Sequence, residues 1–220
     1  SKIRSDDFST FVQRLILEMR VLQHLAPSTD QRNSKISFDV GPAKASHSPS
    51  VKSVGITGQI TGSRADIILA DDVEIPNNSD TPIKRSKLRT SIEEFEAIIR
   101  TGEGKEVIFL GTPQSQESIY NELPSGGKHG YVVRIWPAEY PPNGAMVNYY
   151  GDRLSPMLLG KLNTQPDLAG TPTDTRFDKE ELEKRKARYG KSGYALQFQL
   201  NTTLSDELKY PLKCWDLIFA

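Results

Sequence analysis

Two short, wholly apolar runs on either side of a helical pattern place the tightest constraint on how this 220-residue chain folds. The runs are residues 67–70 and 107–110, and both end abruptly in polar residues. Strands that are apolar throughout are typical of a parallel sheet covered by helices. Between them, residues 83–100 repeat apolar side chains at helical spacing, and Gly102 and Gly104 follow. This order predicts a strand–helix–strand unit with a right-handed crossover.

Other segments extend this unit in both directions. Residues 8–25 have the spacing of an amphipathic helix, whose apolar stripe we expect to be core, and residues 178–200 predict a second helix with charges of both signs. Residues 36–40 form a strand candidate. Two further candidates, 54–56 and 131–135, are expected to join the two apolar strands in one parallel sheet. The predicted fold class is therefore α/β.

Composition narrows the class of protein. Lys+Arg and Asp+Glu both number 28, so any DNA contact must come from local groups and not from net charge. The longest apolar runs fall far short of the roughly 20 residues that a membrane-spanning helix needs. The single Cys214 cannot form an intrachain disulfide and is expected to be a buried small hydrophobe, which favours a reducing intracellular setting. The chain has no initiator Met and no signal peptide, so we interpret it as part of a longer protein.

Three carboxylates, Asp71, Asp72 and Glu74, follow the first apolar strand. Ligands of open parallel sheets bind beyond the carboxyl ends of the strands, and a Walker B motif holds Mg²⁺ there. The alternative is that the aspartates only cap the next helix. Neighbouring carboxylates argue against it, because like charges repel and a divalent cation tolerates both. We predict Asp71 as the magnesium ligand and Asp72, in preference to Glu74, as the base that polarises the attacking water.

The second apolar strand ends in Gly111, Thr112, Pro113 and Gln114. Next to a Walker B strand, such a turn is typical of a sensor, and we expect the Thr112 hydroxyl or the Gln114 amide to respond to the γ-phosphate of ATP. Taken alone, Gly-Thr-Pro would be an ordinary turn. The strand order further predicts that Asp71 and Gly111 emerge at the same edge of the sheet.

Longer motifs carry a specific resemblance, and they lie at residues 50–58, 61–66, 70–78, 110–114, 135–138, 149–154 and 195–201. Together they resemble the large terminase subunit of short-tailed autographivirus phages over essentially the whole chain. The resemblance implies a RecA-like fold of the ASCE P-loop NTPase class, with ATP and Mg²⁺ as cofactors. It also implies a pentameric ring that drives double-stranded DNA into the procapsid, with portal protein and small terminase subunit as partners, in the host cytoplasm and without a membrane.

The chain departs from that family pattern in two ways. It contains no G-x-x-x-x-G-K-[ST] motif, and it lacks the RNase H-like nuclease domain. We therefore expect residues 1–140 to be an ATPase core without its phosphate-binding loop, incomplete at the N-terminus. Residues 141–177 are expected to be a surface excursion, and 178–220 the C-terminal helical part of the ATPase domain with the start of a linker. The 220 residues alone are expected to be inactive.

Arg64 lies in the glycine-containing loop before the acidic strand. Related terminases are similar in carrying an arginine there, which implies a finger that acts on the ATP of the adjacent subunit. The strand between Arg64 and Asp71 is too long for Arg64 to reach the nucleotide of its own subunit. The alternative is a surface arginine that pairs with Asp66 or a neighbour, an interaction worth little energetically.

Two other functions stay open. A different P-loop machine, such as a helicase, could share the acidic strand and the Gly-Thr-Pro turn. A non-catalytic module that binds portal, small terminase subunit or DNA could keep the fold without turnover, and the missing phosphate loop favours that function for these 220 residues alone.

Overall fold

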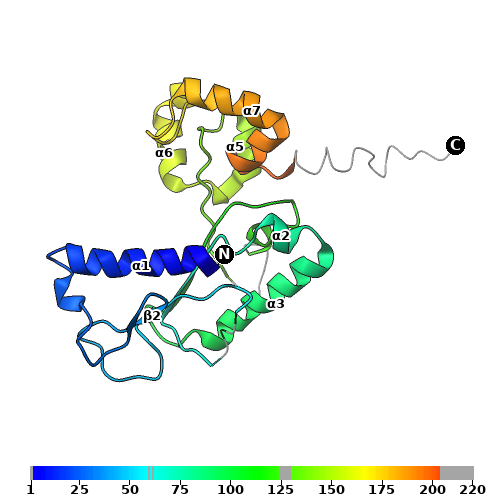
Figure 1. Ribbon diagram of the computed structural model, residues 1–220. Helices are drawn as coiled ribbons and strands as arrows, with labels where there is room; N and C mark the ends of the chain where they lie inside the picture. The colour runs from blue at the N-terminus through cyan, green and yellow to red at the C-terminus, as the bar shows by residue number, and fades with distance from the viewer. Residues whose placement is uncertain (1, 59, 61, 124–129, 204–220) are drawn as a thin grey trace. The chain divides into compact units, whose positions relative to one another are not determined.

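The chain forms two compact units, Ser1–Gly111 and Thr112–Ala220 (Figure 1). The computed structural model describes residues 2–58, 60, 62–123 and 130–203. None of the helices in these ranges is both long and apolar enough to cross a bilayer. The structure is mixed α/β, with helices and two small sheets.

The first unit combines helices with one antiparallel and one parallel sheet. Its helices are α1 (Lys2–Glu18), η1 (Gln23–Leu25), α2 (Pro76–Ser79) and α3 (Pro82–Ile98). The antiparallel sheet has the order β1-β2-β3, with β1 at Asn33–Ser34, β2 at Ser37–Phe38 and β3 at Val51–Lys52. The parallel sheet pairs β4 (Ile67–Asp71) with β5 (Glu106–Leu110).

The β4–α3–β5 unit confirms the central prediction from sequence. The Thr81 side chain caps the start of α3 by accepting a hydrogen bond from the Lys84 amide, and Pro82 follows at the first helical position. The helix buries Leu88, Ile92, Phe95 and Ile98. The rings of Phe95 and Phe109 stack with centroids 5.9 Å apart, so α3 covers one face of the strand pair. Residues 67, 69, 108 and 110 on the other face are exposed.

The four-stranded parallel sheet expected from sequence is not seen, because the described residues contain only two parallel strands. Residues 54–56 are not a strand: the Gly58 amide donates to the Gly55 carbonyl and closes a turn, while β3 pairs with β2. Residues 131–135 are not a strand either, and Ile135 makes one isolated bridge to Leu154. Both segments are apolar enough for strands, but their backbone groups form hydrogen bonds outside the parallel sheet.

Helix α1 begins and ends earlier than expected, and only part of the predicted apolar stripe faces inward. It ends at Glu18 and is followed by η1, whereas the sequence predicted one helix over 8–25. Ser9 and Ile16 are buried, but Phe8 and Phe11, expected in the core, are exposed. Polar side chains attach the start of the helix to the neighbouring chain. The Ser5 hydroxyl donates to the Val54 carbonyl, and Asp6 accepts a 2.6 Å bond from Ser53.

One arginine in the first unit holds a surface loop. The Arg32 guanidinium donates to the main-chain carbonyls of Ser46, His47 and Ser48, and its Nε lies 2.9 Å from Asp39 Oδ2. The hydrogen bond from Arg32 lowers the pKa of the Asp39 carboxyl. Arg32, which lies outside this loop in the sequence, thus helps to fix the loop in place.

The second unit is helical, with the helices α5, α6 and α7 gathered into one group (Figure 1). Its elements are α4 (Ile119–Glu122), α5 (Gly144–Tyr150), η2 (Gly151–Arg153), α6 (Pro156–Thr164), η3 (Pro166–Leu168) and α7 (Lys179–Gln197). Residues 141–177 were expected to be a surface excursion, but they hold the α-helices α5 and α6. They also supply Tyr150, Leu154 and Leu158 to a buried cluster whose fourth member is Tyr140. Short helices show too few turns for a clear periodicity, which is why the sequence pattern was weak here.

Helix α7 confirms the predicted C-terminal helix and its mixed charges. Asp178 caps its start by accepting a 2.7 Å bond from the Glu181 amide, and Lys184 pairs with Glu180 one turn away. Gly190 has φ 67°, so the helix is broken there. Cys214 and the linker expected near the C-terminus lie outside the described residues.

Candidate functional site

Asp71 is the last residue of β4, at the carboxyl edge of the parallel sheet, and it is exposed. In the parallel register it pairs with Leu110, and Gly111 follows at once. Asp71 and Gly111 therefore leave the sheet at the same edge, as the sequence predicted. An exposed carboxylate at this edge is available to a ligand beyond the strand ends.

Asp72 turns away from the strand. Its φ is 45°, in the left-handed region, which aspartate adopts more readily than most residues. Its amide still donates a 2.9 Å bond to the Leu110 carbonyl, so the strand pairing extends to this residue. Arg4, from the first turn of α1, places Nη1 3.9 Å from Asp72 Oδ2. No local signal in the sequence indicated this contact, because 67 residues separate the two partners along the chain.

Glu74 is buried, with 2% of its surface exposed. The bend that carries it inward is held by Asn78, whose side chain donates to the Val73 carbonyl at 2.8 Å and accepts from the Ile75 amide at 2.9 Å. The three carboxylates that are neighbours in sequence thus have three environments. Asp71 is exposed, Asp72 faces a cation, and Glu74 is enclosed.

A magnesium ion fits the donor type at this edge. Mg²⁺ takes oxygen ligands in octahedral geometry, and in nucleotide sites it is held by one or two carboxylates together with water and phosphate oxygens. Asp71 offers one such carboxylate. Within the ranges that the structure describes, no three His, Cys, Asp or Glu side chains converge on a point, so a cage made of protein ligands alone is not formed there.

The predicted sensor residues belong to the second unit. Thr112 and Gln114 are half-buried, and Pro113 between them is buried. The Gln114 side chain donates a 2.9 Å bond to the Thr112 carbonyl, which leaves the Thr112 hydroxyl outside that interaction. The segment is neither helix nor strand, as expected for a turn after β5.

Arg64 lies before β4, at the opposite end of the strand from Asp71. Its guanidinium donates to the carbonyls of Ser63 and Ala97, so it binds the last turn of α3, where a cation is favoured by the helix dipole. The alternative was a surface arginine paired with Asp66 or a neighbour: the pair with Asp66 is not seen, whereas the bond to the neighbouring Ser63 is. Asp66 instead pairs with Lys105 at 2.7 Å and with Arg100 at 3.2 Å, and the bond from Lys105 lowers the pKa of its carboxyl.

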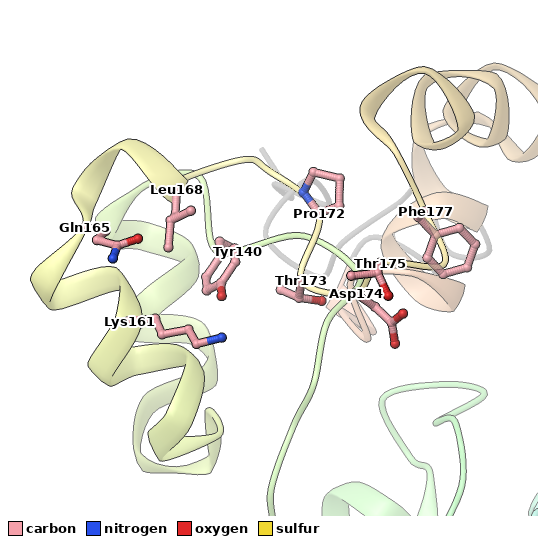
Figure 2. A pocket seen from close by; sticks show the side chains of 9 residues that line it. All are labelled: Tyr140, Lys161, Gln165, Leu168, Pro172, Thr173, Asp174, Thr175 and Phe177. Atoms are coloured by element: carbon pink, nitrogen blue, oxygen red, sulfur yellow. The ribbon is translucent and has the colours of Figure 1, made fainter.

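A separate depression of about 480 Å³ lies in the second unit. Figure 2 shows Lys161 and Gln165 on one side, Thr173 and Asp174 on the other, and Tyr140 between them. None of the residues predicted from sequence lines it. It is open and lined by both polar and apolar side chains.

No family model matches the chain. The chain is related over nearly its whole length to the large terminase subunits, which confirms the resemblance found in its motifs. It is 53% identical over 220 residues to the large terminase subunit of Enterobacteria phage T3, a match that covers 99% of this chain. The chain spans 37% of the length of that relative.

Proposed function

We propose that this chain is part of the ATP-hydrolysing motor of a large terminase, which moves double-stranded DNA into a phage procapsid. The observation that carries the proposal is the parallel β4–β5 pair with Asp71 exposed at its carboxyl edge, in a chain related to a large terminase subunit. The complete domain would have a RecA-like fold that binds ATP and Mg²⁺ at this edge.

Within this proposal, Asp71 holds Mg²⁺ and Asp72 polarises the attacking water. The difference in exposure supports Asp72 over Glu74, because the Asp72 side chain is 43% exposed and Glu74 only 2%. A base must come within hydrogen-bond reach of the water that it activates. Thr112 and Gln114 would sense the γ-phosphate.

Arg64 would serve the neighbouring subunit in a pentameric ring. Its place at the far end of β4 supports a role away from the nucleotide of its own subunit. A guanidinium stabilises the charge that develops on a transferred phosphoryl group. The ring would act with the portal protein and the small terminase subunit in the host cytoplasm.

A second candidate function applies to the 220 residues by themselves. Because they contain no phosphate-binding loop motif, they are expected not to hydrolyse ATP alone. A module that binds portal, small subunit or DNA would then describe this stretch better than an enzyme does.

The deciding experiment replaces Asp71 in a full-length large terminase subunit that carries this sequence. Asp71→Asn should reduce ATPase activity and DNA packaging to background while circular dichroism and the melting temperature stay unchanged, because Asn keeps the shape but not the charge that holds Mg²⁺. Asp80→Asn is the matched control, since Asp80 is an exposed aspartate that pairs with Lys84 on the surface. Turnover of Asp71→Asn near that of Asp80→Asn would contradict the proposal.

A further inference from the structure

The two adjacent aspartates do not continue the strand in the same way. Successive side chains of a regular strand point to opposite faces, so Asp71 and Asp72 would be expected to alternate. Asp72 leaves this pattern because its φ is 45°. A left-handed conformation at a residue other than glycine persists only where the surroundings hold it. Asp72 makes two contacts here: its amide donates a hydrogen bond to the Leu110 carbonyl, and its carboxylate lies 3.9 Å from the Arg4 guanidinium.

Arg4 is well placed to hold a carboxylate. Its backbone belongs to the first turn of α1, which is attached to the body of the unit through the bonds of Ser5 with Val54 and of Asp6 with Ser53. The other cation of this turn, Lys2, pairs with Asp6 at 2.6 Å. The Arg4 side chain is 77% exposed, so its ion pair with Asp72 is expected to add little to stability.

We infer that Arg4 is a positioning residue for Asp72. By attracting the Asp72 carboxylate it keeps this group turned away from Asp71, so that one aspartate is free for the metal and the other is left to polarise water. Without Arg4, Asp72 could swing toward the same cation as Asp71, since a divalent ion attracts both carboxylates. This inference rests on the proposed function, because it concerns the base of that reaction.

The test measures ATPase kinetics in the same full-length subunit with Arg4→Ala, Arg4→Lys and, as matched control, Lys2→Ala. Lys2→Ala removes a cation from the same helical turn without touching Asp72. Arg4→Ala should lower kcat by about tenfold with KM for ATP changed less than about twofold, since a misplaced catalytic group slows the reaction more than it weakens binding. Arg4→Lys should recover part of the loss, and Lys2→Ala should resemble the unchanged protein.

A double variant separates positioning from any other effect of Arg4. Single-turnover hydrolysis by Asp72→Asn should be unchanged when Arg4→Ala is added, because residues that act through one another are not additive. A further loss in the double variant, or equal kinetics for Arg4→Ala and Lys2→Ala, would overturn the inference alone. If Asp71→Asn retains full turnover, the proposed function fails, and this inference fails with it.

Discussion

The buried cluster of the second unit and the parallel strand pair of the first unit differ in how far their apolar side chains are enclosed. In the second unit, Tyr150, Leu154 and Leu158 are almost fully enclosed within their own cluster. In the first unit, one face of the parallel strand pair is open, and Leu69 and Leu110 on it are exposed. Strands that are apolar on both faces need a layer on each side, and α3 supplies one layer only. The contrast is between a cluster enclosed on all sides and a strand pair covered on one face.

The largest effect is expected from the enclosed cluster of the second unit. Leu158 is 1% exposed, so Leu158→Ala leaves a cavity and should lower the free energy of unfolding by about 2–5 kcal/mol. Urea denaturation followed by circular dichroism measures the loss. A change below about 1 kcal/mol would mean that the second unit is packed no better than the first.

A smaller effect is expected from one hydroxyl in the same cluster. The Tyr150 hydroxyl donates to the Gln199 carbonyl, and burial raises the pKa of this phenol. Tyr150→Phe removes the donor and leaves the carbonyl without that bond, which should cost about 1 kcal/mol in the same denaturation assay. Tyr189→Phe is the control, because Tyr189 is exposed. Equal stability of the two variants would show that the bond adds nothing to the cluster.

The smallest effect is expected on the open face of the first unit. Leu69 is 44% exposed, so Leu69→Ala removes the same atoms as Leu158→Ala from a site that is far less enclosed. The free energy of unfolding should fall by less than about 1 kcal/mol. A loss as large as that of Leu158→Ala would show that this face is covered in solution, and the comparison between the units would fail.

The sequence predicted those elements whose pattern is local. The β4–α3–β5 unit followed from two apolar runs and the helical period between them, and α7 from the helix predicted over 178–200. Residues 54–56 and 131–135 have strand composition but no strand partner in the described chain. Whether an apolar run becomes a strand depends on which backbone can pair with it, and composition does not carry this information.

The candidate site, too, was predicted only where it depends on a local sequence pattern. The edge shared by Asp71 and Gly111 followed from the parallel order of two strands. The burial of Glu74 depends on a bend held by Asn78, and the contact between Arg4 and Asp72 depends on where α1 packs. Both are tertiary effects, so no spacing in the sequence indicated them.

The attachment of the loop by Arg32 has a consequence for how freely that loop can vary. Its three loop partners are main-chain carbonyls, at Ser46, His47 and Ser48, and every amino acid has a main-chain carbonyl. The hydrogen bonds from Arg32 therefore do not depend on the side chains of the residues that it holds. Substitutions at residues 46–48 leave these three bonds from Arg32 in place, whereas they remove the bonds that the Ser46 and Ser48 hydroxyls accept from the Ser48 and Arg64 amides.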